Sequence, residues 1–186
     1  ESQPFLEAVR QISLEVGREN SLFIHVTLVP FLRGSDEHKS KPTQHSVKQL
    51  QELGIQPDVL VLRTEHEITP EARRKIALFC NVAPEDVVQS IDVKSIYQVP
   101  VKMHEQHLDE IVLRLTDTPS RGEPHMAPWL HFLDKMARAE KPVTIGLVGK
   151  YVELQDAYKS INEALFQAAT YADHKLDRRY IHSEKL

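Results

Sequence analysis

The sequence has one cysteine, no strong excess of basic charge and no long hydrophobic run, and each shortage excludes a class of protein. A single thiol, Cys80, cannot form an internal disulfide, and this fits a protein of the reducing cytoplasm. The longest apolar run, over residues 22–31, contains His25, Thr27 and Pro30 and is far shorter than a membrane span. No secretory signal opens the chain. We therefore expect a cytoplasmic protein without a membrane partner.

The charge balance argues against a nucleic-acid partner. The formal net charge is −4, the isoelectric point is near 6.2, and the sequence contains no long basic stripe. Hydrophobic residues make up 41% of the 186 residues, which is enough for a substantial core. This length allows one domain, or one domain and part of another.

Apolar segments that alternate with amphipathic segments predict an α/β fold with a parallel sheet. Residues 22–29 and 58–62 are typical of strands that are buried on both faces. Thr69 and Pro70 indicate the start of a helix in which Ile76, Phe79 and Cys80 face the core. Two further helices are expected, one along the stripe formed by Phe5, Val9, Ile12 and Val16 and one over residues 108–115.

The composition changes after this first set of elements. Residues 116–128 hold three prolines and a glycine, which is the linker signal of the chain. Beyond it, a strand over residues 143–148, a helix over 156–171 and a strand over 179–182 predict a βαβ unit. We expect a first domain over residues 1–117, a linker over 118–141 and the start of a second domain over 142–186. The chain reads as part of something longer.

The stretch Lys-Ser-Lys-Pro-Thr-Gln-His-Ser, residues 39–46, has two interpretations. Thr43 is a suitable N-cap for a helix that carries Val47 and Leu50 inward and ends at Gly54. Free backbone N–H groups at the helix start, beside two ammonium groups, would form a phosphate site. The same pattern is also typical of a solvated surface turn, and charge alone leaves both interpretations open.

Other candidate sites have weaker support. Gly146 and Gly149 are too close together for a phosphate loop, and Tyr151 stands where a hydroxyl residue should follow Lys150. Nothing places a base near Cys80, which favours a buried structural thiol. His104 and His107 are spaced to share a helix face and a metal ion, but their acidic neighbours indicate a solvated face, and no metal site is predicted.

The lysine stretch resembles the Lys-Thr-Lys-Pro-Thr-Gln-His-Ser signature of the CTP synthase family. The similarity continues in register through residues 54–58, 73–82, 92–97 and 149–154, and it covers nearly the whole chain. The resemblance implies the C-terminal part of a synthetase domain with a P-loop-NTPase-like parallel sheet. It also implies the first βαβ of a flavodoxin-like class I glutamine amidotransferase domain.

The resemblance further implies a ligase of pyrimidine biosynthesis. In this family ATP phosphorylates O4 of UTP, and ammonia from glutamine hydrolysis then displaces phosphate to give CTP. CTP is the feedback inhibitor, GTP the activator, and the assembly a homotetramer. The phosphate loop, the Mg²⁺ ligands and the glutaminase triad have no counterpart in this sequence, so we expect no catalytic residue here and no activity from the chain alone. Two rival classes are a regulatory nucleotide-binding module and an assembly piece.

The resemblance assigns two sets of ligand-binding residues. Contacts with UTP or CTP are implied for Glu1, Lys39, Ser40, Lys41, Pro42, Thr43, Gln44 and Lys75. Contacts with ATP are implied for Arg63, Ile91, Asp92 and Val93, the last three through backbone groups near the adenine. Without the resemblance, Lys75 and the arginines before it would read as a charged surface.

Overall fold

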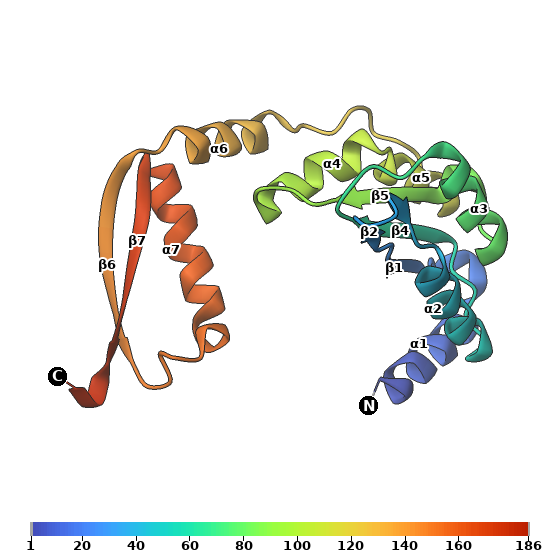
Figure 1. Cartoon of the computed structure of the whole chain (residues 1–186), viewed down its shortest axis with the longest axis horizontal. Helices are drawn as coiled ribbons and strands as arrows, with labels where there is room; N and C mark the ends of the chain where they lie inside the picture. The colour runs from blue at the N-terminus through green and yellow to red at the C-terminus, as the bar shows by residue number, and fades with distance from the viewer. Residues whose placement is uncertain (1, 186) are drawn as a thin grey trace. The chain divides into compact units, whose positions relative to one another are not determined.

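The computed structural model describes residues 2–185, including every side chain there except those of Gln155 and Lys185. The chain divides into two compact units, unit 1 up to Gly122 and unit 2 from Glu123 onward, each of which is described by itself (Figure 1). No helix among the described residues is long and apolar enough to cross a membrane.

Unit 1 is built around a three-stranded parallel sheet in the order β1-β4-β5. The strands of unit 1 are β1 (Ile24–Leu28), β2 (Phe31–Leu32), β3 (Glu37–His38), β4 (Val59–Thr64) and β5 (Val87–Ile91). The helices are α1 (Gln3–Val16), α2 (Lys41–Glu52), α3 (Pro70–Cys80), α4 (Val99–Glu105) and α5 (Leu108–Leu115). Short 3-10 turns lie at η1 (Arg18–Asn20), η2 (Pro84–Asp86) and η3 (Ile96–Gln98). Strands β2 and β3 pair as a separate antiparallel hairpin.

The sheet is covered on both faces at β4 and β5, as their buried residues show. One face of β1 is open, since Ile24, Val26 and Leu28 are exposed, so the prediction that residues 22–29 are buried on both faces was wrong for this face. On one face, Leu60 and Leu62 of β4 join a core cluster with Val47 of α2 and Ile76 of α3. On the other face, the cluster contains Val59, Val61 and Val88 together with Ile111 of α5. Because both faces of β4 meet helices, its side chains are hydrophobic at successive positions rather than alternating with polar ones. The predicted α/β class is confirmed.

Local signals mark the start of α3 and the end of α2 where the sequence indicates. Thr69 accepts a hydrogen bond from the backbone N–H of Ala72 at 3.3 Å, which caps α3. At the end of α2, Gly54 has φ +81°, and the N–H groups of Gly54 and Ile55 donate to the carbonyls of Gln51 and Leu50. This pair of bonds is a Schellman motif, and it needs the left-handed conformation that glycine adopts most easily.

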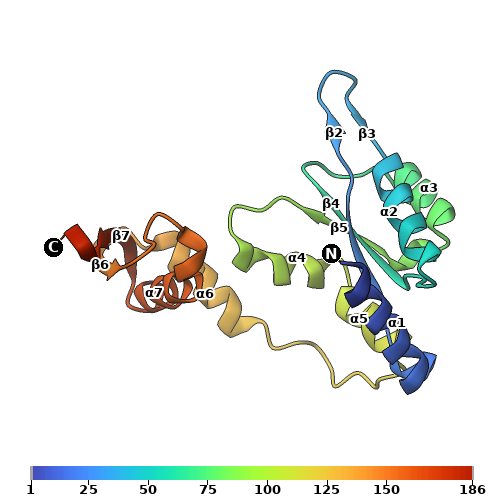
Figure 2. The same ribbon diagram turned by 90° about the horizontal axis from the view of Figure 1, so that it is seen from below.

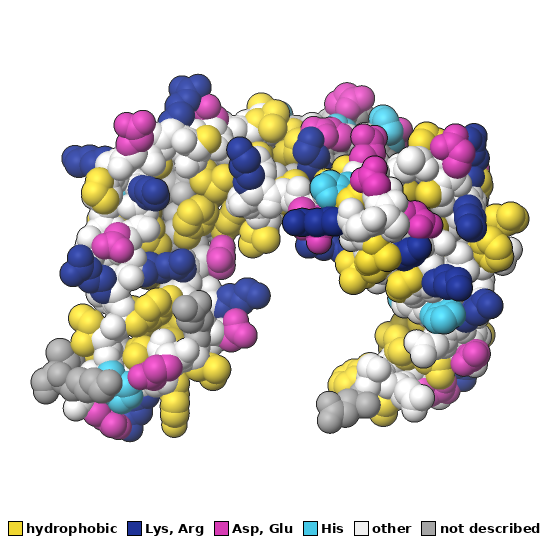
Figure 3. Space-filling model, in the orientation of Figure 1, with side chains coloured by type: hydrophobic (Ala, Val, Ile, Leu, Met, Phe, Trp, Pro, Cys, Tyr) yellow, Lys and Arg dark blue, Asp and Glu magenta, His cyan; other side chains and the backbone are white. Residues whose placement is uncertain are grey.

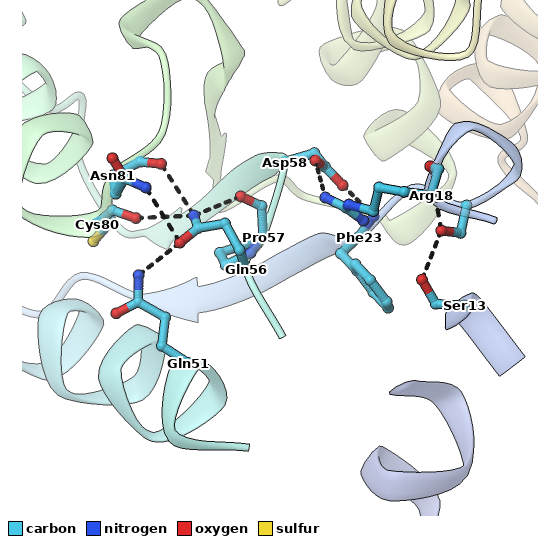
Figure 4. Close-up of polar contacts among 10 residues, drawn as sticks. Ser13, Arg18, Phe23, Gln51, Gln56, Pro57, Asp58, Cys80 and Asn81 are labelled. Carbon is cyan, nitrogen blue, oxygen red and sulfur yellow. Dashed lines mark hydrogen bonds and ion pairs between the residues drawn. The ribbon is translucent and has the colours of Figure 1, made fainter. Parts of the chain in front are cut away.

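Structural hydrogen bonds occupy the amino end of β4 (Figure 4). The Gln56 amide donates to the carbonyls of Cys80 and Asn81 at 3.3 and 3.0 Å. The Asp58 carboxylate accepts from the backbone N–H of Phe23 at 2.8 Å and from Arg18. These bonds tie α3 and β1 to the start of β4. Parallel α/β sheets bind ligands at the opposite edge, outside the carboxyl ends of the strands.

Unit 2 contains the predicted βαβ arrangement. Strands β6 (Lys141–Gly149) and β7 (His174–His182) pair in parallel, and α7 (Lys159–Tyr171) connects them. The other elements are α6 (Ala127–Arg138), η4 (Gln155–Tyr158) and η5 (Ser183–Lys185). Pro142 lies inside β6, so the strand begins earlier than its apolar residues suggest.

Two features of unit 1 differ from those that the sequence predicts. Strand β5 is not expected from the sequence, because its five residues include two polar ones, Gln89 and Ser90, which are buried. The apolar stripe of α1 forms the expected helix but lies exposed, with Phe5 at 75% of its full exposure. Figure 3 shows hydrophobic side chains at the surface of both units, among interspersed basic and acidic ones.

Candidate functional site: a basic pocket at the carboxyl end of β1

Helix α2 begins three residues earlier than the sequence indicates. Its first residue is Lys41, and its N-cap is Ser40 with φ −81° and ψ −17°, which makes no side-chain capping bond. The expectation that Thr43 is the N-cap was therefore wrong. Pro42 is compatible with this earlier start because its fixed φ suits the first helical turn and it has no N–H to satisfy.

Thr43 serves instead to attach α2 to the end of β1. Its side chain is fully buried, and its hydroxyl donates to the carbonyl of Leu28 at 3.1 Å. A second contact of 3.1 Å joins it to the hydroxyl of Thr27. This hydroxyl is engaged inside the protein, so any influence of Thr43 on a ligand passes through the placement of α2.

The start of α2 forms one wall of a cavity of about 640 Å³. The β2–β3 hairpin and helix α3 supply the other walls, and Figure 2 shows the hairpin extending from the end of the sheet. Five residues that the resemblance assigns to the pyrimidine nucleotide line this cavity, which we call the basic pocket: Lys39, Ser40, Lys41, Gln44 and Lys75. Segments far apart in the chain thus place three ammonium groups around one space of ligand size.

The charges in the basic pocket are only partly paired. Lys39 Nζ lies 2.6 Å from Glu37 Oε2. Among the described residues, neither Lys41 nor Lys75 forms an ion pair. The hydrogen bond from Lys39 and, to a smaller extent, the charge of Lys75 hold the pKa of Glu37 below its usual range. Within the described part of the chain, the pocket therefore offers two lysines without an ion pair and one that is shared with the Glu37 carboxylate, while Asp36 adds a second carboxylate to the lining.

The neutral groups of the pocket can also bind a polar ligand. The Gln44 side-chain amide donates to Ser40 Oγ at 3.1 Å, which leaves the Ser40 hydroxyl proton for another acceptor. Phe79 lines the pocket and is 53% exposed, although the helical pattern places it in the core. Its neighbours Ile76 and Cys80 are buried as expected.

Two described residues of the implied pyrimidine set do not line the basic pocket. Pro42 is exposed and Thr43 is buried, and neither lines the basic pocket. Glu1 lies outside the described residues.

The implied ATP residues meet at the carboxyl ends of β4 and β5. Ile91 is the last residue of β5 and pairs with Thr64 of β4. The next residue, Asp92, donates its backbone N–H to the Thr64 carbonyl at 3.0 Å, and its carboxylate lies 2.8 Å from the Arg63 guanidinium. Val93 follows directly and is half-buried. The structure thus brings these four residues to one edge of the sheet.

The remaining candidates have structural explanations. Burial raises the pKa of the Cys80 thiol to about 11, which suppresses the nucleophilic thiolate. His104 lies on α4, whereas His107 lies beyond its end with φ +58°, so the two do not share a helix face. They contact separate carboxylates, Asp109 at 2.8 Å and Glu110 at 3.0 Å. Gly149 ends strand β6.

Sequence reasoning missed the contribution of the hairpin to the pocket. Asp36, Glu37 and His38 line the cavity, and none of them was singled out. The ring of Phe31 packs against those of His38 and His66, at centroid distances of 5.0 and 4.3 Å, and holds the hairpin to the loop after β4. The Gly-Ser-Asp sequence after Arg33 is a turn signal from which the hairpin could have been found.

Unit 1 is thus an α/β unit with a basic pocket outside the carboxyl end of a parallel strand, the region where such sheets bind ligands. A sequence model described as CTP synthase N-terminus matches residues 1–117. The chain belongs to the CTP synthase family.

Several CTP synthases are similar to the chain over its whole length. The identity is 58% with CTP synthase of Porphyromonas gingivalis, 56% with that of Bacteroides fragilis and 49% with that of Methanocaldococcus jannaschii. The chain spans about a third of these relatives, or 34%, 35% and 34% of their respective lengths.

Proposed function

We propose that the chain is part of an enzyme that makes CTP from UTP, using ATP and ammonia released from glutamine. The basic pocket is the observation that carries this proposal. It collects the ammonium groups of Lys39, Lys41 and Lys75 in a cavity of about 640 Å³. Family membership supplies the identity of the ligand, and the pocket supplies charge of the right sign and a space of suitable size for a nucleoside triphosphate.

Each pocket residue has a defined role in this proposal. The three lysines bind triphosphate oxygens of UTP, or of CTP acting as the feedback inhibitor. Ser40 and Gln44 supply hydrogen bonds. Pro42 and Thr43 act indirectly by shaping and anchoring the first turn of α2. Glu1 is proposed to complete the pyrimidine site.

ATP is proposed to bind near the carboxyl ends of β4 and β5. Arg63 is the cation there, and backbone groups of Ile91, Asp92 and Val93 contact the adenine. In the structure the Arg63 guanidinium is engaged by Asp92 at 2.8 Å, and both side chains are about half exposed, so a phosphate can compete for this weakly held cation.

The reaction is proposed to need further parts of a longer protein. No group of three or more acidic, histidine or cysteine side chains that could hold a metal ion occurs among residues 2–185, and we propose that Mg²⁺ is bound elsewhere. Unit 2 is proposed to begin the glutamine amidotransferase domain, and a cytoplasmic homotetramer activated by GTP is the proposed assembly. The isolated chain should produce no CTP from UTP, ATP and ammonia, and measurable product would refute this point.

Replacement of Lys41 tests the pyrimidine-nucleotide site. In the complete protein, Lys41→Ala should raise the Kd for UTP and for CTP by about 10- to 100-fold, because a charge-assisted hydrogen bond is lost. Isothermal titration calorimetry measures both constants. Lys48→Ala is the matched control, since Lys48 is an exposed lysine of the same helix outside the basic pocket. Unchanged affinity in Lys41→Ala would show that the assignment of the pocket is wrong.

A further inference from the structure

Two carboxylate residues, Asp36 and Glu37, line the basic pocket, and among the described residues Glu37 is the one that forms an ion pair with a pocket lysine. Its carboxylate lies 2.6 Å from Lys39 Nζ, and of the three pocket lysines Lys39 is the one that is paired among the described residues. Glu37 belongs to β3, in the hairpin that extends from the end of the sheet in Figure 2.

We propose that Glu37 is an internal competitor of phosphate, which occupies Lys39 in the empty pocket and thereby sets the affinity of the pocket for nucleoside triphosphates. This inference rests on the function proposed above. In this proposal the lysines create the affinity for the triphosphate, and Glu37 lowers it.

The geometry allows two outcomes when a triphosphate enters, and both give Glu37 the same role. If the phosphate replaces the carboxylate on Lys39, the 2.6 Å ion pair must first be broken. If Lys39 bonds to both through its three N–H donors, the carboxylate remains beside phosphate oxygens of the same sign. In either case the carboxylate opposes binding, and loss of its charge should strengthen binding.

The ion pair is poorly suited to a structural role. Both side chains are partly exposed, Lys39 at 41% and Glu37 at 58%, and pairs this exposed contribute little to folding. The backbone of Lys39 is held separately, since its N–H donates to the Pro30 carbonyl at 2.9 Å. The hairpin is also fastened by the His38 ring, which donates to the His66 carbonyl at 3.2 Å. Neutralisation of Glu37 should therefore leave Lys39 in the pocket.

The test is the binding of UTP and UMP to the complete protein carrying Glu37→Gln. At low salt we expect the Kd for UTP to fall by about 3- to 10-fold, with a smaller fall for UMP because it carries less charge. In about 1 M salt, where the screening length is near 3 Å, most of the gain should vanish. Glu105→Gln is the matched control, because Glu105 forms the same kind of 2.6 Å pair with Lys102 but lies outside the basic pocket.

Lys41→Ala, measured in parallel, separates the two proposals. If Lys41→Ala weakens UTP binding while Glu37→Gln leaves it unchanged or weakens it, the inference about Glu37 is overturned and the site stands. A gain that is equal for UTP and UMP and insensitive to salt would also overturn it, because a rearranged pocket rather than charge would be the cause. If neither substitution changes binding, the proposed site and the role of Glu37 both fail.

Discussion

The hydroxyl of Thr43 donates a hydrogen bond to the carbonyl of Leu28 at 3.1 Å, and this bond joins the first turn of α2 to the last residue of β1. Because the single hydroxyl proton of Thr43 is used there, Thr27 must be the donor in the 3.1 Å contact between the two threonines. These two contacts fix the position of the first turn of α2 relative to the end of β1. They thereby fix the position of Lys41 in the lining of the basic pocket.

Replacement of Thr43 by valine should destabilise unit 1 by about 1–3 kcal/mol, since the shape is kept while the Leu28 carbonyl loses its donor and the buried Thr27 hydroxyl loses its acceptor. Hydrogen exchange of the α2 amides, followed by mass spectrometry, measures this loss locally. Thr43→Ser retains the hydroxyl and should protect these amides better than Thr43→Val. Equal protection in the two variants would contradict the role of the hydrogen bond.

Glu7 should show a pH dependence with a defined sign. Hydrogen bonds from Arg10 and then Gln11 lower the pKa of Glu7 from 4.5 to about 2. The unfolded chain therefore takes up this proton at a higher pH than the folded one, so the stabilisation is complete above about pH 4.5 and is lost as the pH falls toward 2. The Tm difference between wild type and Glu7→Gln, measured across this range, should shrink on acidification.

Arg10→Ala provides the control for this titration. Without the guanidinium, the pKa of Glu7 should return toward 4.5, and the pH dependence should move with it. A Tm difference that stays constant from pH 2 to 5 in the wild-type background would contradict the prediction.

Cys80 should be nearly inert toward alkylating reagents in the folded protein. Burial raises the pKa of its thiol to about 11, so at pH 8 only about one molecule in a thousand carries the thiolate. Labelling by iodoacetamide, followed at the peptide containing Cys80, should be at least about 100-fold slower in the native state than in denaturant. Similar rates in both states would show that the thiol is accessible.

Substitution of Gly149 should disturb the end of strand β6. A Cβ atom on this residue would lie 2.2 Å from the Tyr158 hydroxyl, which donates a hydrogen bond to the Lys150 carbonyl. Gly149→Ala must displace the end of the tyrosine side chain and break that exposed bond, at a cost of about 0.5–1.5 kcal/mol. Thermal unfolding and hydrogen exchange of unit 2 measure the effect.

Gly146→Ala is the matched control in the same strand. Its nearest neighbour would be Ile181 Cδ1 at 3.4 Å, an ordinary contact, so the change in stability should be small. If Gly146→Ala costs as much as Gly149→Ala, the close approach of Tyr158 is not the reason for glycine at position 149.

Local chemistry made much of unit 1 predictable. Thr69 and Pro70 mark the start of α3, and Gly54 the end of α2, because capping depends on residues within a few positions of each other. The buried strand β4 is recognisable from its apolar residues alone. Strand β5 was missed because its run of Val-Val-Gln-Ser-Ile is short and contains two polar residues that are buried.

The candidate site was less predictable, because its walls depend on contacts between distant segments. Phe79 has the spacing of a core residue, yet it borders the pocket, since only the neighbouring positions of α3 face the sheet. Thr43 has the chemistry of an N-cap, yet the helix begins three residues before it, and its hydroxyl donates to the carbonyl of Leu28. In both cases a tertiary contact overrides a local preference.

By itself, the sequence determined the α/β class, the βαβ unit near the C-terminus and the helix ends that are capped by nearby residues. Periodicity and capping operate over one or two turns of chain, and they can be read without knowledge of the fold. Only the tertiary structure decided that Lys39, Lys41 and Lys75 surround one cavity and that Glu37 shares it. Packing of α2, α3 and the hairpin against the sheet brings together charges that lie up to 38 residues apart in the sequence.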